Sequence, residues 1–300
     1  MSALPEGGGW RARLGLQFEA RQGRTRIAHR RHEGPLVVQR AFYPERVSAD
    51  PPLPVAGDVA ARSALACACE PCHVYILHPP GGVASGDDLG VDVGVGAGAH
   101  ALLTSPAAGK FYRRGAAGVS RLAQALHVAN GGVLEWLPNE NIFFPDATVA
   151  LETRVDLEAG ARFVGWEIGC LGLPSQGRGL ASGILGLAFE LRHAGRPLLL
   201  ERLRLDRDSL TARWGLGGCN AFGTWLGFPA TTPDLECARA SLPESCADTT
   251  VACTLVDGVL VCRALGMRAD RVKHAFVDLW RALRPALVGR RAVTPRIWAT

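Results

Sequence analysis

Three glutamates stand inside short apolar segments, where a buried carboxylate has to be compensated. Glu135 lies within Leu-Glu-Trp-Leu, Glu167 within Gly-Trp-Glu-Ile, and Glu201 follows three leucines. Burying an ionised carboxylate is costly unless an arginine, hydrogen bonds, water or a cation compensates for it. A paired arginine is the commoner arrangement, and Arg202 or Arg204 could supply it. Three such carboxylates also favour an internal hydrated cavity, although the sequence does not show whether they face each other.

A run of prolines and glycines is the most unusual segment of the chain. It comprises His78, Pro79, Pro80, Gly81 and Gly82, with Asp87 and Asp88 shortly after it. Consecutive prolines lack N–H donors and cannot lie in the middle of a sheet, while the glycines permit positive φ. We expect a rigid loop that delivers His78 and Asp87 to a defined place. The loop is either a shaped corner between strands or a polar lining and partner-contact site.

A second mixed segment places aromatic side chains among cations, with Lys110, Tyr112 and Arg113 close together in the chain. Such a segment is more often a solvated strand end than a binding site. We group it with the proline-glycine loop and Glu135 as candidate partner contacts.

Soft metal ligands gather at Cys67, Cys69, Cys72 and His73. Thiolate and imidazole bind borderline metals strongly, but no second half of a structural zinc site accompanies them, which favours incidental cysteines. The sequence contains no phosphate-binding loop, no G-x-S-x-G and no H-E-x-x-H. One alternative is a metal-dependent hydrolase built on His78, Asp87, Asp88 and Glu167, since carboxylates and imidazole can hold a metal with an open position.

The composition indicates a folded, β-rich protein. Of 300 residues 48% are hydrophobic, which suffices for a large core, and 36 glycines and 19 prolines suit short strands joined by turns. No segment approaches the roughly 18 apolar residues of a membrane span, and no secretory signal is evident. The nine scattered cysteines favour reduced thiols in the cytoplasm. A net charge of +5 without a long basic run argues against nucleic-acid binding.

The elements that position these residues are mostly strands. Polar and apolar residues alternate over 10–18 and 149–157, as in half-buried strands, and short apolar runs at 36–38, 74–77, 99–104 and 198–205 predict others. The strands 251–255 and 259–264 flank Asp257-Gly258, which predicts a tight hairpin turn. After Asp270 the apolar period becomes helical. Asp270 is the expected N-cap and Pro285 the expected end.

We therefore expect a mainly β fold with many short strands in one large domain over residues 1–300. Residues 1–9 are expected to be a disordered N-terminus. Residues 48–70, rich in alanine and proline, are expected to form an inserted loop, and further loops are expected at 78–88 and 172–183.

Taken together, the chain resembles the UreD (UreH) family of urease accessory proteins from Trp10 to its last residue. The resemblance is carried by collinear segments at 34–40, 42–45, 72–73, 78–82, 86–87, 110–113, 134–138, 165–167, 199–202 and 295–300. It implies a β-rich fold with two helices, one near the C-terminus. It also implies a protein without catalytic activity that binds UreF, apo-urease and, through UreF, the GTPase UreG.

The resemblance further implies a water-filled tunnel that leads Ni²⁺ inward, with Asp87, Glu167 and Glu201 as its polar lining. Nickel would be held weakly and in transit, with no permanent cofactor. Carboxylate oxygens hold Ni²⁺ less well than imidazole or thiolate, and a conduit has to release its ion. The chain departs from the family at Gly109, where Ser or Thr is usual, and at Arg178, where an acidic residue is more frequent. A second alternative is a β-rich interaction module without a metal role.

Overall fold

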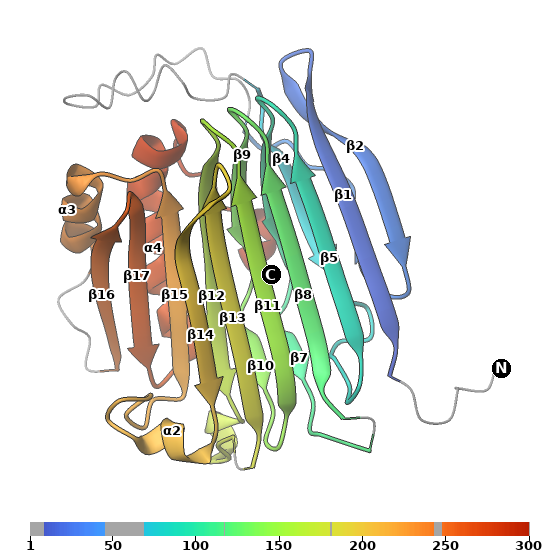
Figure 1. Ribbon diagram of the computed structural model, residues 1–300, viewed down its shortest axis with the longest axis vertical. Coiled ribbons are helices and arrows are strands. Elements are labelled where there is room, and N and C mark those ends of the chain that lie inside the picture. Colours follow the sequence, from blue (N-terminus) through green and yellow to red (C-terminus); the bar gives the residue numbers. More distant parts are fainter. Residues whose placement is uncertain (1–8, 46–68, 117, 181, 243–247, 300) are drawn as a thin grey trace.

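Two β-sheets lie face to face, and helices cover the far side of one of them, as Figure 1 shows. The computed structural model describes residues 9–45, 69–116, 118–180, 182–242 and 248–299. Residues 1–8 of the expected disordered N-terminus and residues 48–68 of the expected inserted loop, Cys67 included, lie outside the described residues. The last residue of that segment, Glu70, is buried and pairs with Arg24 at 2.5 Å.

The first sheet has seven strands and forms the front layer in Figure 1. In spatial order they are β14 (Arg196–Leu205), β13 (Ile184–His193), β11 (Thr148–Leu157), β8 (Ser120–Val128), β5 (Asp88–Val95), β1 (Arg11–Arg21) and β2 (Arg24–Glu33).

The second sheet has ten strands and lies behind the first. Its main path runs through β16 (Thr249–Val256), β17 (Val259–Gly266), β15 (Ala221–Phe228), β12 (Arg162–Leu171), β9 (Val133–Leu137), β6 (His100–Thr104), β4 (Cys72–Leu77) and β3 (Val37–Val38). The short strands β10 (Asn141–Phe143) and β7 (Gly109–Phe111) pair beside β12.

The chain winds between the two sheets in a solenoid-like path. From β4 to β13 the longer strands alternate between the sheets, and within each sheet their neighbours are parallel. Strands β6 and β9 are covered on both faces and are buried at every residue, whereas β8 and β11 have one solvent face and alternate. This difference follows from burial of one or two faces of a strand.

The main sequence predictions for the strands are confirmed. In β1 the apolar residues Ala12, Leu14, Leu16 and Phe18 are buried while their neighbours face solvent. The turn between β16 and β17 has positive φ at both central residues, 48° at Asp257 and 77° at Gly258. Asp and Gly adopt this conformation more readily than most residues, which closes the hairpin with two residues.

The described residues contain three α-helices and two short 3-10 turns. They are α2 (Arg207–Thr211), α3 (Thr232–Ser241), α4 (Ala269–Val288), Pro174–Gln176 and Arg296–Ala299. The resemblance implied two helices, one of them near the C-terminus; α2 is only five residues long. No helix in the described part of the chain is long and apolar enough to cross a membrane.

The ends of α4 differ from the sequence prediction. Arg268 occupies the N-cap position, and Asp270 lies in the first turn, where it pairs with Arg268 at 2.7 Å. Pro285 lies inside the helix, which continues to Val288 and ends at Gly289 with φ 76°. The loss of one backbone hydrogen bond at Pro285 is offset because the last turn packs Leu287 and Val288 into the core.

Two hydrophobic cores follow from this layering. One fills the space between the sheets and includes Phe18, Trp136 and Phe163. The other lies between the ten-stranded sheet and the helices α3 and α4 and includes Trp225 and Trp280. Full burial of one large apolar side chain contributes about 1.5–3 kcal/mol. The central strands β9 and β12 of the ten-stranded sheet therefore have two apolar faces, and a polar residue on them points into one core or the other.

Candidate functional site

Glu167 and Glu201 both point into the space between the sheets. On β12 the flanking residues Trp166 and Ile168 belong to the helix-side core, so Glu167 faces the seven-stranded sheet. On β14 Glu201 lies opposite Phe189 of β13, whose side chain is buried between the sheets. The alternation of side chains along two strands thus brings the two carboxylates to one layer.

Glu167 lines two cavities in this layer. One, of about 330 Å³, is lined by Glu167, Glu201 and Arg263 together with apolar residues such as Phe189 and Phe222. The other, of about 290 Å³, also includes Glu167 and extends to the proline-glycine loop, with His78 and Lys110 in its wall. Glu167 is therefore the carboxylate that the two cavities share.

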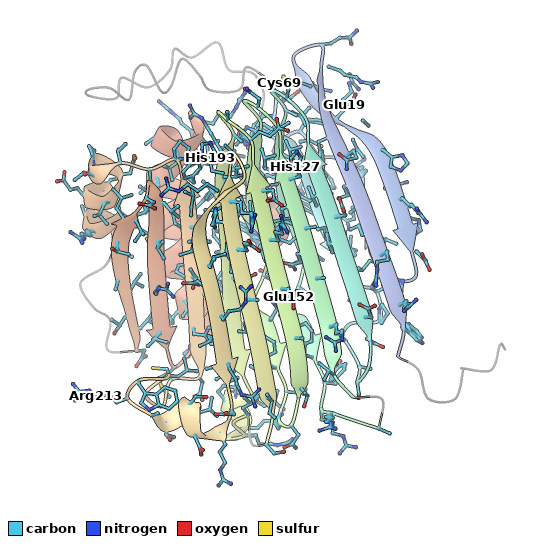
Figure 2. The ribbon with its side chains drawn as sticks, in the orientation of Figure 1. Glu19, Cys69, His127, Glu152, His193 and Arg213 are labelled. Atoms are coloured by element: carbon cyan, nitrogen blue, oxygen red, sulfur yellow. The ribbon has the colours of Figure 1, made fainter. Side chains whose placement is uncertain are left out.

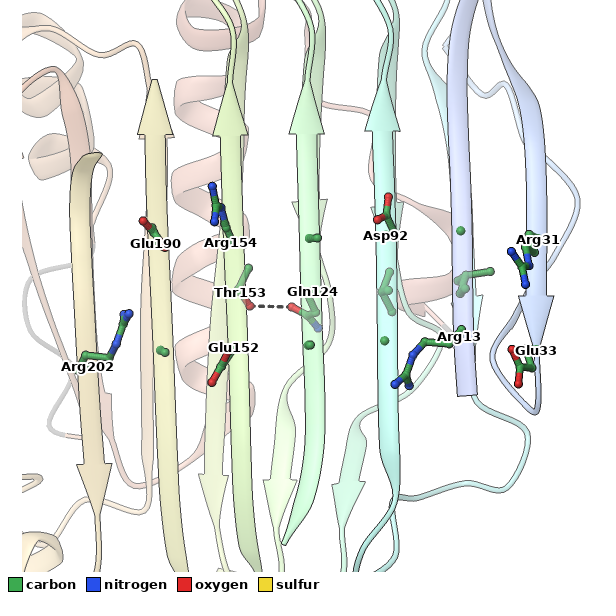
Figure 3. A pocket seen from close by; sticks show the side chains of 17 residues that line it. Arg13, Arg31, Glu33, Asp92, Gln124, Glu152, Thr153, Arg154, Glu190 and Arg202 are labelled. Carbon is green, nitrogen blue, oxygen red and sulfur yellow. Dashed lines mark hydrogen bonds between the residues drawn. The ribbon is translucent and has the colours of Figure 1, made fainter. Parts of the chain in front are cut away.

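Glu167 has a hydroxyl partner and is not paired with an arginine in the interactions described. The Thr153 hydroxyl bonds to Glu167 Oε1 and also lies 2.8 Å from Gln124 Oε1 (Figure 3). One hydroxyl hydrogen cannot serve two acceptors. Either a protonated Glu167 donates to Thr153, or the Gln124 amide is turned and an ionised Glu167 accepts. Burial raises the pKa of Glu167 to about 7; the Thr153 hydrogen bond opposes this rise and the Glu201 charge adds to it.

Glu201 forms an ion pair that crosses the layer. Its partner is Arg263 of β17, on the opposite sheet. The sequence prediction that Arg202 or Arg204 would pair with these carboxylates is wrong. Arg202 alternates to the outer face of β14, and Arg204 lies 3.7 Å from Asp206. An adjacent residue in a strand points to the opposite face, so it cannot pair across the interior.

The proline-glycine loop forms part of the wall of the second cavity. His78, Pro79, Gly81 and Gly82 line it, together with Lys110. Burial lowers the pKa of His78, and the charge of Asp87 opposes that effect. A Cβ at Gly82 would lie 2.3 Å from the Tyr112 ring, so the absence of a side chain lets the ring approach the loop. Tyr112 and Arg113 are exposed beside it.

Asp87 braces the loop and lines neither of these two cavities. Its carboxylate accepts hydrogen bonds from the backbone N–H groups of Trp10 and Ala84, each at 2.7 Å. The side chain is buried, and these bonds join the loop to the start of β1. The structure thus brings Glu167 and Glu201 together and keeps Asp87 apart, at the base of the loop.

Glu135 lies on the helix side of the ten-stranded sheet, fully buried. Arg284 of α4 donates to Glu135 at 2.8 and 2.9 Å and to Glu45 at 2.6 and 3.0 Å. His100 and Trp280 each lie 2.7 Å from the Glu135 carboxylate. Burial alone would raise the pKa of Glu135, but the Arg284 charge and the bonds from His100 and Arg284 hold it well below its usual range. Because its side chain lies in the interior, Glu135 does not form part of an exposed partner surface.

The cysteine-histidine segment is used in packing. His73 is buried and lies 2.6 Å from Glu45, so it belongs to the same ionic cluster. Cys72 is buried, and burial raises the pKa of its thiol to about 11. Within the described ranges no three His, Cys, Asp or Glu side chains gather in a way that could hold a metal ion.

The outer face of the seven-stranded sheet carries an open groove of about 630 Å³ (Figure 3). Small residues such as Gly90, Ala123 and Ala188 form its floor, and charges of both signs stand along it. Figures 2 and 3 show Glu152 of β11 on this face, where it is exposed. Its mixed charges give the groove no preference for one sign of ligand.

Four residues of these sites were missed by the sequence analysis, namely Thr153, Gln124, Arg263 and Arg284. Only Arg284 left a signal, because it follows Phe276 and Trp280 at four-residue spacing and therefore stands on the apolar face of the C-terminal helix. The other three depend on contacts between strands far apart in the chain.

Comparison with known proteins identifies close relatives along almost the full length. The model of the family described as UreD urease accessory protein matches residues 11–299. A urease accessory protein UreD from Alcanivorax borkumensis is 39% identical over 97% of this chain and 93% of its own length. Those of Pseudomonas entomophila and Azoarcus sp. are 40% and 41% identical, each over 97% of this chain and 95% of its own.

Proposed function

Because the chain belongs to the UreD family of urease accessory proteins, we propose that it takes part in loading Ni²⁺ into apo-urease. In this proposal it is a scaffold between apo-urease and the complex of UreF with the GTPase UreG. It also conducts the ion through the layer between its sheets. Nickel is the cargo, held in passing.

The position of Glu167 in the walls of both inter-sheet cavities is the observation that carries this proposal. With Glu201 in one cavity and His78 in the other, polar ligands recur along one layer. The flanking walls are apolar, with Phe189 and Phe222 on one side and Trp136 on the other. A cation in such a route meets ligands at intervals and is solvated between them by water.

The chemistry of these ligands suits transit better than storage. Carboxylates bind Ni²⁺ more weakly than a set of thiolates and imidazoles does. Arg263 already pairs with Glu201, so an arriving cation competes with a guanidinium. Conduction requires binding that is strong enough for entry and weak enough for exit. A route lined by a few carboxylates, without a complete ligand set at any one point, meets this requirement.

The partners in the proposal are UreF and apo-urease, with UreG joined through UreF. Large apolar side chains are exposed on β14 and in the segment after α2, among them Leu200 (58% exposed) and Trp214 (80% exposed). Exposed apolar residues of this size support a protein-binding surface. The proposal assigns the chain no catalytic step and keeps the cytoplasm as its compartment.

A metal-dependent hydrolase finds less support. Its four candidate ligands would have to converge, but Asp87 uses both carboxylate oxygens on backbone N–H groups. Asp88 pairs with Arg13 at 2.6 Å. That leaves His78 and Glu167 without a third ligand for an open metal site.

Urease activation in cells tests the proposal. Cells carry the urease structural genes and the other accessory genes, with or without this chain. We expect urease activity and the nickel content of purified urease to rise together only when the chain is present. Full activity and full nickel content without it would overturn the proposal.

A further inference from the structure

Two cysteines face each other across the hairpin at the edge of the ten-stranded sheet. Cys253 of β16 is the register partner of Cys262 of β17. The two-residue turn makes Val256 and Val259 a hydrogen-bonded pair, and such pairs alternate with non-hydrogen-bonded ones along an antiparallel ladder. Cys253 and Cys262 stand three pairs further on and therefore form a non-hydrogen-bonded pair.

Non-hydrogen-bonded pairs bring side chains closest together. Their Cα atoms are about 4.5 Å apart, within the range of about 4.4–6.8 Å that a disulfide spans. Both residues are free thiols, so neither is committed to another disulfide. We propose that Cys253 and Cys262 form a peroxide-oxidisable dithiol, a reversible modification site that fastens edge strand β16 to β17.

The surroundings give the two sulfurs different roles. Cys262 is completely buried in the helix-side core, whereas Cys253 is partly exposed. Arg239 of α3 lies beside Cys253 and donates to its backbone carbonyl at 3.2 Å. The neighbouring Cys262 thiol lowers the pKa of Cys253, and the Arg239 charge adds to this effect while partial burial opposes it. Interaction with Cys253 and burial raise the pKa of Cys262. Cys253 is thus the attacking thiolate and Cys262 the resolving thiol.

The reaction is balanced with hydrogen peroxide as the oxidant. The Cys253 thiolate attacks one peroxide oxygen, the O–O bond breaks, and the departing hydroxide takes a proton to become water. The Cys262 sulfur then attacks the sulfenic sulfur, the S–O bond breaks, and the second oxygen leaves as water with the Cys262 proton. Two thiols lose two electrons and two protons in total, and a dithiol reductant reverses the step by exchange.

The site is separate from the proposed nickel route. Cys262 belongs to the core between the ten-stranded sheet and the helices α3 and α4. Glu167 and Glu201 lie between the two sheets, on the opposite side of the ten-stranded sheet. The disulfide would tie the outermost strand of the sheet, against which α3 packs, to its neighbour. An exposed strand edge that is held covalently has less freedom to open or pair with another chain.

Peptide mapping of the full-length protein tests the proposal. The protein is treated with hydrogen peroxide, blocked at free thiols, and cut on the amino side of aspartates without reduction. The cut releases peptides 248–256 and 257–269, each of which contains a single cysteine. We expect these two peptides joined, with the mass of two hydrogens lost, and separated again by a dithiol. Their remaining separate and thiol-blocked while other cysteines are oxidised would overturn the proposal.

Variants assign the two roles. In Cys262→Ser a dimedone-trapped sulfenic acid should accumulate at Cys253, and in Cys253→Ser little oxidation should reach the buried Cys262. Cys237→Ser is the matched control, because Cys237 is exposed on α3 and belongs to no pair in the proposal. It should leave the rate of disulfide formation unchanged, whereas Arg239→Gln should slow it several-fold. Equal rates in wild type and Arg239→Gln would contradict the role of Cys253.

Discussion

Glu135 and Glu167 sit in neighbouring strands of one sheet, each inside an apolar segment, yet they lie in opposite chemical settings. Glu135 points to the helix side, where Arg284, His100 and Trp280 all bond to it. Glu167 points between the sheets, where a hydroxyl and cavity space surround it. One carboxylate is held ionised by its partners, and the pKa of the other rises to about 7.

The comparison separates structural carboxylates from functional candidates. A buried charge with a complete set of partners fixes the packing of several elements, and a cation could not displace those partners easily. A carboxylate with incomplete compensation and space beside it can accept a proton or a metal ion. The difference lies in the partners and the neighbouring cavity. The sequence does not show it, because both residues stand inside similar apolar segments.

The largest expected effect comes from removing Arg284, the main partner of the compensated carboxylate Glu135. Arg284→Met removes the guanidinium that serves both Glu45 and Glu135 and leaves two buried carboxylates without it. Loss of one partner of a buried ionic cluster costs about 3–5 kcal/mol. We expect this fall in the free energy of unfolding, measured by urea denaturation.

Arg281→Met is the matched control for Arg284→Met. Arg281 lies on the same helix and pairs with Asp278, but both side chains are about half exposed. Exposed pairs contribute about 0–1 kcal/mol. Similar losses in the two variants would show that the helix itself, and not the buried cluster, accounts for the effect.

A smaller effect on the free energy of unfolding is expected from Glu167, whose charge is incompletely compensated, and this effect depends on pH. The folded pKa of Glu167 is raised from 4.5 to about 7, so the folded state binds the proton more tightly than the unfolded one. The stabilisation is complete below pH 4.5 and is lost as pH rises through 7. One pKa unit corresponds to about 1.4 kcal/mol, which limits the change to about 3.5 kcal/mol, less where cavity water screens the charge.

Glu167→Gln should remove this pH dependence. The measurement is the free energy of unfolding of both proteins from pH 4 to pH 8, with Glu152→Gln as control because Glu152 is exposed on the outer face. Parallel curves for wild type and Glu167→Gln would mean that folding does not raise the pKa of Glu167.

The smallest effect is expected at Glu201. Its pair with Arg263 is partly exposed, so Glu201→Ala should change stability by about 1 kcal/mol or less. Removing the nearby negative charge should lower the pKa of Glu167. The pH-dependent step in stability should therefore move to lower pH, while a step that stays in place would show that the two carboxylates do not interact.

Local patterns in the sequence predicted much of the fold. Alternation located β1 and β11, and Asp257-Gly258 located the last hairpin, because these features depend on neighbouring residues. The solenoid-like winding could not be predicted, because parallel pairing joins strands that are distant in the chain. The helix end was misplaced at Pro285, since the packing of its last turn is a tertiary effect.

The candidate site was predictable only in part. The residue types at Glu167 and Glu201 stood out from their apolar neighbours, and the structure places both in one layer. Asp87 carried the same expectation, but its two backbone hydrogen bonds were invisible in the sequence. Arg263 and Thr153 contact these carboxylates from other strands, so no local pattern could reveal them.

The nickel content of urease distinguishes a nickel route between the sheets from a scaffold without one. Urease is purified from cells that carry Glu167→Gln, Glu201→Gln or the exposed-face control Glu152→Gln in this chain, and co-purification of the accessory proteins is measured in parallel. We expect a several-fold fall in nickel for Glu167→Gln and Glu201→Gln, with the complex still assembled and the control unchanged. Full nickel loading in both the Glu167→Gln and the Glu201→Gln variant would contradict the proposed nickel route and favour an interaction module without a metal role.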